Sequence, residues 1–226
     1  MIVAIILARG GSKRIPGKNI KFFAGRPVIH YPIESAISSG LFDRIIVSTE
    51  SAKIAEVARK VGAEAPFRRP DELSDDLTTT AEALGHAIEW LNDHGPEVRY
   101  ACGIYGAAPF VQSGDLSAGF ELLKRRGAMT VLPVTTFDFP IQRAFELDKR
   151  GTMRMIHPEY ELTRSNDLPV TYHDAGQFYW LDAPKFLQDG KLYGEPTIPL
   201  MLPRYRVQDL DTLEDWEMAE RLYKAL

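Results

Sequence analysis

The segment Ile2-Val3-Ala4-Ile5-Ile6-Leu7-Ala8 runs directly into Arg9-Gly10-Gly11-Ser12-Lys13-Arg14-Ile15-Pro16-Gly17-Lys18-Asn19. The first part is almost continuously apolar, which is typical of a strand covered on both faces. The second part is basic and rich in glycine, so a loop begins there. In an open α/β sheet, ligands bind at the carboxyl ends of the strands. This one segment therefore predicts the fold class and the position of the functional site.

Strand-like and helix-like patterns alternate along the rest of the chain. Further strands are predicted at residues 44–48, 101–105, 129–134 and 177–181, and helices at 28–37, 54–61, 78–91, 116–123, 184–189 and 213–226. Pro27 is expected in the first turn of its helix, Gly62 at a C-terminal cap, and a threonine followed by Glu82 at an N-terminal cap. The alternation predicts a single α/β domain over residues 1–226. Its sheet should be Rossmann-like and mostly parallel, with helices on both faces.

Residues 136–171 break this alternation. They carry apolar side chains among charged ones without a helical period, including Phe137, Phe139, Phe145 and Met153. We expect hairpins that leave the main sheet. Exposed aromatic and methionine side chains favour a subunit interface, so the segment is interpreted as a dimerisation arm and the protein as a homodimer. The alternative is an arm that folds back on its own domain.

Composition and charge exclude several classes of protein. The 226 residues are 45% hydrophobic and 26% charged, as in a folded enzyme and unlike a disordered chain. The net charge of −4 argues against nucleic acid as a partner. The single cysteine, Cys102, allows no internal disulfide and is expected to be buried. No apolar run reaches the ~18 residues that cross a bilayer, so we expect no membrane partner and a cytoplasmic location.

Charge is distributed unevenly along the chain. Six basic residues and no acidic one lie between positions 9 and 26: Arg9, Lys13, Arg14, Lys18, Lys21 and Arg26. The loop has neither the spacing of a P-loop nor a G-x-G-x-x-G fingerprint. Gly10 and Gly11 would nevertheless let backbone N–H groups approach a phosphate, with Arg9 and Lys18 supplying charge on either side. The alternative is a solvated basic face.

Asp209 and Asp211 begin an acidic segment that contains no base up to Glu220. On an extended chain, residues two apart point to the same face. Two carboxylates on one face are a common way to hold Mg²⁺ beside substrate phosphates. The alternative is a cluster of acids that caps the helix beginning near Thr212.

Four segments in order resemble the N-acylneuraminate cytidylyltransferase family, which activates nine-carbon acidic sugars. They are residues 7–19, residues 41–49, Arg69-Pro70-Asp71-Glu72-Leu73-Ser74-Asp75-Asp76, and Asp209-Leu210-Asp211-Thr212. Where sialic-acid members carry Gln-Pro-Thr-Ser-Pro, this chain has Tyr105-Gly106-Ala107-Ala108-Pro109. That segment and the run His173-Asp174-Ala175-Gly176-Gln177-Phe178-Tyr179-Trp180 resemble the pseudaminic acid branch.

The resemblance implies a nucleotide-diphospho-sugar transferase-like fold and a reaction in which CTP and a nonulosonic acid give a CMP-sugar and pyrophosphate. It implies that the nucleotide is bound by Ala8, Arg9, Gly10, Ser12, Lys13, Lys18, Asn19, Arg69 and Thr80. It also implies that Lys18, Arg9 and Asp211 are the catalytic residues, and that Asp209 and Asp211 bind the Mg²⁺ cofactor. The sugar would contact Tyr105, Arg143, His173, Asp174, Gln177 and Tyr179, with Gln177 and Tyr179 facing the site together.

Several alternatives stay open at the level of sequence. Without the resemblance, Arg69 is better interpreted as a surface residue near Pro70. The alternative for His173 is a turn residue bonded to backbone, while Phe178 and Trp180 are expected in the core. The same reaction could act on legionaminic, N-acetylneuraminic or 3-deoxy-octulosonic acid. A non-catalytic nucleotide-binding protein would not need both Lys18 and the acidic pair. A sugar-phosphate uridylyl- or guanylyltransferase is disfavoured, because residues 105–108 contain no carboxylate.

Overall fold

The first apolar segment becomes an interior strand of a seven-stranded sheet, next to the edge strand. The computed structural model describes residues 1–226. Strand β1 (Ile2–Leu7) pairs in parallel with β4 (Arg44–Ser48) on one side and with β5 (Tyr100–Tyr105) on the other. The order across the sheet is β11-β6-β10-β5-β1-β4, with β9 paired to β6. The remaining strands are β6 (Thr130–Thr136), β9 (Tyr172–Asp174), β10 (Phe178–Asp182) and β11 (Thr197–Met201).

The sheet is mostly parallel, as predicted. Strand β10 lies between β5 and β6 and runs antiparallel to both, while β11 is parallel to β6 and β9 antiparallel to it. Strands β9 and β11 were not predicted from the sequence. β9 has only three residues, and β11 is an edge strand that contains Pro199, so neither shows a clear strand pattern.

Helices cover both faces of the sheet, because neighbouring residues of β1 point to opposite sides. Ala4 and Ile6 pack in the cluster formed with α1 (His30–Ser39), α2 (Ala52–Val61) and α4 (Ser113–Arg126). Val3 and Ile5 pack in the cluster formed with α3 (Thr80–Asp93) and α5 (Ala183–Asp189). A third cluster joins the small hairpin β2 (Phe22–Phe23) and β3 (Arg26–Pro27) to α6 (Leu213–Ala225). The predicted layer arrangement is therefore confirmed.

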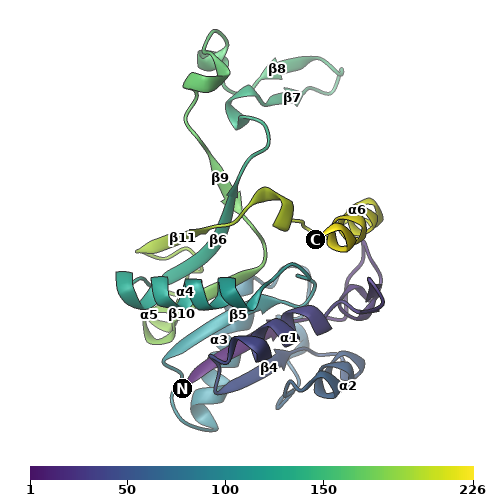
Figure 1. Cartoon of the computed structure of the whole chain (residues 1–226), viewed down its shortest axis with the longest axis vertical. Coiled ribbons are helices and arrows are strands. Elements are labelled where there is room, and N and C mark those ends of the chain that lie inside the picture. The colour runs from purple at the N-terminus through teal and green to yellow at the C-terminus, as the bar shows by residue number, and fades with distance from the viewer.

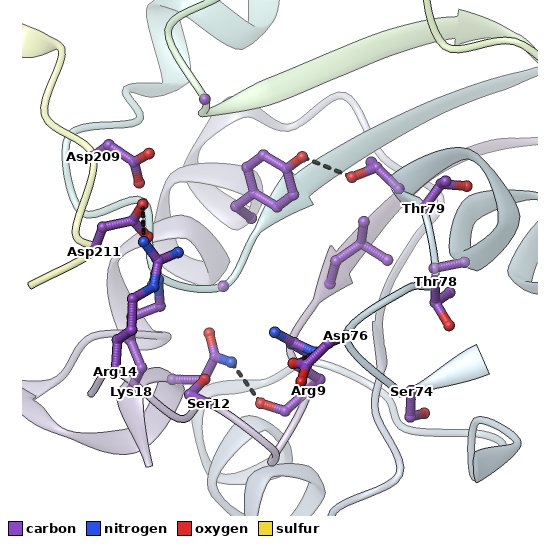
Figure 2. A pocket seen from close by; sticks show the side chains of 18 of the residues that line it. Arg9, Ser12, Arg14, Lys18, Ser74, Asp76, Thr78, Thr79, Asp209 and Asp211 are labelled. Carbon is purple, nitrogen blue, oxygen red and sulfur yellow. Dashed lines mark hydrogen bonds and ion pairs between the residues drawn. The ribbon is translucent and has the colours of Figure 1, made fainter. Parts of the chain in front are cut away.

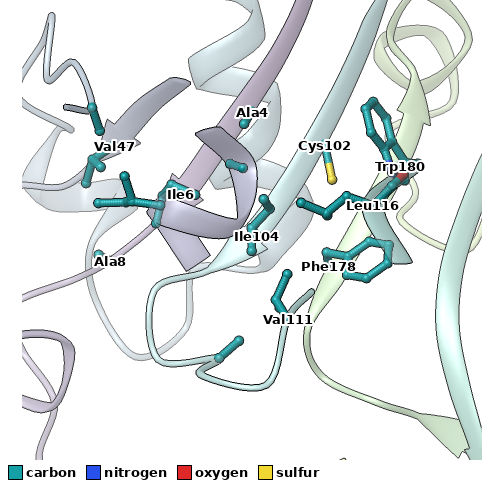
Figure 3. Packing of buried hydrophobic residues seen from close by; sticks show 14 of the residues in the cluster. Ala4, Ile6, Ala8, Val47, Cys102, Ile104, Val111, Leu116, Phe178 and Trp180 are labelled. Atoms are coloured by element: carbon teal, nitrogen blue, oxygen red, sulfur yellow. Dashed lines mark hydrogen bonds between the residues drawn. The ribbon is translucent and has the colours of Figure 1, made fainter. Parts of the chain in front are cut away.

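The largest core cluster joins side chains of β1, β4, β5 and β10 to the helices on one face of the sheet (Figure 3). Phe178 and Trp180 are fully buried there, as predicted, and the Trp180 indole N–H donates a 2.9 Å hydrogen bond to the carbonyl of Leu116. Cys102 is also fully buried, and burial raises the pKa of its thiol well above the usual value. The thiol is therefore a packing group.

Two predicted helix caps are confirmed and one is wrong. Gly62 ends α2 in a left-handed conformation with φ 106°, and Thr79 forms a capping box with Glu82 at the start of α3. Pro27, by contrast, belongs to β3 and not to the first turn of α1. The turn at Ala24 and Gly25, both with positive φ, folds this segment into a hairpin before the helix begins.

Between β6 and β9 the chain leaves the sheet. Strands β7 (Phe145–Leu147) and β8 (Met153–Met155) form an antiparallel hairpin that pairs with no other strand. The hairpin and the return segment project away from the body instead of folding back over it (Figure 1). Short 3₁₀ helices connect the elements: η1 (Lys18–Ile20), η2 (Asp71–Leu73), η3 (Ile141–Arg143), η4 (Pro158–Tyr160), η5 (Ser165–Asp167) and η6 (Arg204–Arg206). None of the helices combines the length and apolar character that a transmembrane helix needs.

Candidate active site

A pocket of about 580 Å³ opens at the carboxyl ends of β1 and β5. The basic loop after β1, the segment 69–80 before α3, the start of the segment after β5, the β9–β10 turn and the segment before α6 all contribute to its lining. Figure 2 shows how side chains from these distant segments face one cavity. Twelve of the residues proposed from the sequence line it: Arg9, Ser12, Lys13, Lys18, Asn19, Arg69, Thr80, Tyr105, Asp174, Tyr179, Asp209 and Asp211.

The basic loop is paired with an acidic residue across the pocket. Arg9 Nη1 donates 2.7 Å hydrogen bonds to Asp76 Oδ1 and to the carbonyl of Asp75. Lys13 forms an ion pair with the other oxygen of Asp76. One carboxylate thus bridges two cations that come from a single loop. The loop presents concentrated positive charge to the pocket, which suits a polyanionic ligand.

Gly10 does not present its backbone N–H to the pocket as the expected phosphate cradle requires. The Gly10 N–H does not line the pocket, because it donates a 2.6 Å hydrogen bond to Glu50 Oε1. A Cβ at Gly10 would lie 3.0 Å from that oxygen, so glycine allows the close approach of Glu50. Ala8 is fully buried in the core and is not a lining residue either. The structure thus places neither Ala8 nor Gly10 in the pocket lining, and their proposed nucleotide contacts stay predictions.

The acidic pair lies on the opposite side of the pocket. Lys18 Nζ donates a 2.8 Å hydrogen bond to the carbonyl of Leu210 and lies 3.7 Å from Asp211 Oδ1. Arg14 Nη1 donates a 2.8 Å hydrogen bond to Asp211 Oδ2. Helix α6 is capped by Thr212 and Asp215, so capping by Asp209 or Asp211 is the wrong interpretation.

Asp209 and Asp211 fit a hard divalent cation. Desolvation, together with the negative charge of Asp211, raises the pKa of Asp209 and outweighs the opposing effect of the positive charges of Lys18 and Arg14. No group of three or more His, Cys, Asp or Glu side chains is arranged so that it could hold a metal ion. A metal held by this pair would therefore complete its coordination with oxygens of water or substrate, as Mg²⁺ commonly does.

Arg69 is a buried residue of the pocket wall and not a surface residue. Only 4% of it is exposed, although it lines the cavity. Burial lowers the pKa of its guanidinium, while nearby Glu50 acts in the opposite direction. Arg69 Nη2 lies 3.7 Å from Glu50 Oε2, and Arg69 Nε donates a 3.2 Å hydrogen bond to Ser74 Oγ.

Hydroxyl groups form the wall between α3 and β10. The hydroxyls of Thr80 and Tyr105 share a 2.7 Å hydrogen bond. Tyr179 donates a 2.5 Å hydrogen bond to Asp174 Oδ2. Burial, reinforced by Tyr105 and Asp174, raises the pKa of Tyr179, so its phenol stays protonated. This wall can bind the hydroxyl and amide groups of a polar ligand.

Three residues proposed for the sugar do not line the pocket. Gln177 precedes β10, is buried, and donates a 2.6 Å hydrogen bond from Nε2 to the carbonyl of Arg206, so the expectation that it faces the site with Tyr179 is wrong. The His173 ring packs against Phe137, and its Nδ1 lies 2.9 Å from the Asp174 carbonyl, as in the backbone-bonded alternative. Arg143 lies in the projecting arm and donates a 2.5 Å hydrogen bond to the carbonyl of Thr163.

The pocket is also lined by residues that the sequence did not predict for the site. Arg14, Ser74, Asp76 and Gln208 line it. Arg14 belongs to the basic run and Asp76 to the acidic pair after Ser74, so both lay within motifs already recognised. Gln208 precedes Asp209 but has no pattern of its own in the sequence.

Comparisons with known proteins identify the family of the chain. Residues 3–193 match the family model described as "Cytidylyltransferase". A pseudaminic acid cytidylyltransferase from Campylobacter jejuni is 40% identical over 222 residues, covering 98% of this chain and 96% of that protein. A CMP-N,N'-diacetyllegionaminic acid synthase from Legionella pneumophila is 29% identical and covers 98% of this chain and 95% of its own length.

A solved structure supports the fold. A CMP:2-keto-3-deoxy-manno-octonic acid synthetase complexed with CTP matches with a TM-score of 0.70 at 16% identity, covering 99% of this chain and 98% of that one. The family model covers most of the chain, and the Campylobacter relative aligns along nearly its whole length. This chain belongs to the cytidylyltransferase family.

Proposed function

We propose that this protein is a pseudaminic acid cytidylyltransferase, which converts CTP and pseudaminic acid to CMP-pseudaminic acid and pyrophosphate. The observation that carries the proposal is the 40% identity, over 98% of the chain, to a protein of that name. The basic and acidic sides of the pocket support it, because nucleotidyl transfer needs both a triphosphate site and a place for a metal ion.

The basic side of the pocket is suited to the triphosphate. Arg9, Lys13 and Lys18 come from one loop, and all three side chains line the cavity. They would bind the phosphates and stabilise charge on the departing pyrophosphate, with Ser12 and Asn19 as neutral contacts. Thr80, at the start of α3, would reach the base. Catalysis would then come mainly from positioning and charge stabilisation.

Asp209 and Asp211 would hold Mg²⁺, which when bound acts as a Lewis acid on a phosphate oxygen. Lys18 lies beside Asp211, so it would orient the phosphates next to the acidic pair. In the reaction the anomeric C2 hydroxyl of the sugar acid gives up its proton to solvent and its oxygen attacks the α-phosphorus of CTP. The bond between that phosphorus and the bridging oxygen breaks, and pyrophosphate leaves with the electron pair. The wall of Tyr105, Asp174 and Tyr179 would bind the sugar.

The arm supports a homodimeric enzyme. Its exposed apolar hairpin needs a covering surface, and Arg143 at its base does not line the pocket of its own chain. In the proposed dimer Arg143 would act as a carboxylate clamp in the partner's site.

The test is pyrophosphate release with each of CTP, UTP, GTP and ATP in the presence of Mg²⁺. Each nucleotide is combined with pseudaminic, legionaminic or N-acetylneuraminic acid, beside an Asp211→Ala variant. Release with CTP and pseudaminic acid alone, lost in the variant, is the expected result. Release with another acid would replace the proposed acceptor but keep the reaction. No release with any pair, while CTP still binds, would contradict enzymatic function.

A further inference from the structure

The peptide group between Arg9 and Gly10 is held at both of its polar ends. Its carbonyl accepts a 2.9 Å hydrogen bond from Asn19 Nδ2, and its N–H donates a 2.6 Å hydrogen bond to Glu50 Oε1. Fixing this peptide plane restricts the directions in which the Arg9 side chain can leave the backbone. Arg9, the first basic residue after β1 in the sequence, is thus oriented by Glu50, which follows a different strand, β4.

The same carboxylate also faces the buried guanidinium of Arg69. Glu50 Oε2 lies 3.7 Å from Arg69 Nη2, and both side chains are largely buried, at 17% and 5% exposed. Glu50 Oε2 accepts no hydrogen bond, although a carboxylate oxygen could. Its interaction with Arg69 is therefore a charge contact only. A buried cation without an anionic partner is strongly disfavoured, so Glu50 stabilises Arg69 where it lines the pocket.

Glu50 itself is not a lining residue of the pocket. It directly precedes Ser51, whose hydroxyl accepts the N-cap hydrogen bond of α2, so the backbone of Glu50 is fixed by the junction of strand and helix. Glu50 therefore acts on the site only indirectly, through its contacts with the backbone of the basic loop and with Arg69.

We propose that Glu50 is a positioning residue for nucleotide binding, because its one carboxylate sets both the Arg9–Gly10 peptide group and the Arg69 guanidinium. The inference rests on the proposed function, since it takes CTP to be the ligand of this pocket. Its consequence is specific: loss of the Glu50 charge impairs binding of the nucleotide and leaves binding of the sugar acid unchanged.

The test compares Glu50→Gln with the wild type by calorimetric titration of CTP with Mg²⁺, without acceptor. Glutamine can still accept the Gly10 hydrogen bond but places no negative charge against Arg69. We expect the Kd for CTP to rise about tenfold, the size of one charge-assisted contact. In the pyrophosphate assay the KM for CTP rises in parallel, while the KM for the sugar acid stays within about twofold.

Glu64→Gln is the matched control. Glu64 forms an ion pair with Arg44 at the edge of the sheet, outside the pocket, so this variant loses a Glu–Arg contact that is shorter and more exposed than that of Glu50. It should lower the melting temperature without changing CTP binding. If Glu50→Gln does not fold, Glu50→Asp replaces it: the shorter side chain keeps the charge but cannot span both partners, and the Kd should rise about threefold.

The outcomes separate the two hypotheses. CTP binding that is unchanged in folded Glu50→Gln or Glu50→Asp overturns the positioning role and leaves the proposed function intact. An equal loss of affinity for CTP and for the sugar acid also overturns it, because that result indicates general damage to the fold. Failure of the wild type to bind CTP overturns the proposed function, and this inference with it.

Discussion

At the scale of single residues, Asp76 controls how accessible the positive charge of the basic loop is. Its carboxylate bridges Arg9 and Lys13 across the opening of the pocket. Hydrogen bonds from Lys13 and Arg9 hold the pKa of Asp76 below its usual value, so it is ionised at neutral pH. In the proposed function a triphosphate binds the same two cations as this carboxylate. We therefore expect Asp76 to compete with the nucleotide.

Replacing Asp76 by asparagine should strengthen nucleotide binding. Asp76→Asn removes the competing charge, so we expect the KM for CTP to fall about threefold, the small effect typical of exposed ion pairs. The effect should shrink as salt is added, because salt screens exposed charges. Pyrophosphate release at varied CTP concentration measures it.

Asp71→Asn provides the comparison for Asp76→Asn. Asp71 forms an exposed 2.5 Å ion pair with Arg68, and neither residue lines the pocket. This variant should leave the KM for CTP unchanged. A higher KM in Asp76→Asn would mean that Asp76 helps the nucleotide to bind and does not compete with it.

The sequence predicted the pocket residues best where a motif lies on one continuous loop. The basic loop and the segment 69–80 reach the pocket as short stretches whose residues stay neighbours in space. It predicted Gln177 wrongly because alternation holds only inside a strand. Gly176, with φ 62°, turns the chain just before β10 begins, and Gln177 then points to the backbone of Arg206. Contacts of that kind join residues far apart in sequence, and no local pattern reports them.

At the scale of elements, the sequence located five strands of the sheet but could not give their directions. An apolar run has the same pattern in either direction. β10 runs antiparallel to β5 and β6 because the chain returns from the arm through β9 and a turn at Gly176. Strand direction is thus decided by where the chain re-enters the sheet, which is a property of tertiary structure.

Helix α4 offers a test of how tightly the layers pack. Gly119 faces the sheet, and a Cβ at this position would lie 2.8 Å from Trp180 Cδ1. Gly119→Ala should therefore destabilise the protein by about 1–3 kcal/mol through overpacking. Gly114 in the same helix has no atom within 4 Å of such a Cβ. Gly114→Ala should stabilise it by about 0.5–1 kcal/mol, because alanine is the better helix former.

Chemical denaturation measures both glycine variants against the wild type. The two substitutions are identical in chemistry and lie in one helix, so helix propensity alone predicts the same sign for both. Equal stabilisation would mean that Trp180 moves aside freely and that the contact between α4 and β10 is loose. Opposite signs would show that close packing on Trp180 outweighs propensity at Gly119.

At the scale of the whole molecule, the arm is an amphipathic hairpin without a covering surface. Leu147 pairs with Met153 across the two strands, and Phe145 with Met155, so these side chains share one face. Glu146 and Arg154 form an ion pair on the other face. Leu147 is 67% exposed and Met153 60% exposed. An isolated two-stranded hairpin is marginally stable in water, so its apolar face needs a partner.

A second copy of this chain is the partner that the proposed dimer supplies, and Leu147→Glu tests it. Burying an unpaired charge in a packed interface is strongly unfavourable. The variant should therefore sediment as a monomer, whereas the wild type should sediment as a dimer. Glu146→Gln, on the polar face of the same strand, should leave the dimer intact. A wild-type monomer at micromolar concentration would contradict the dimer. Loss of the dimer in both variants would indicate that the hairpin itself, and not its apolar face, is what the substitution disrupts.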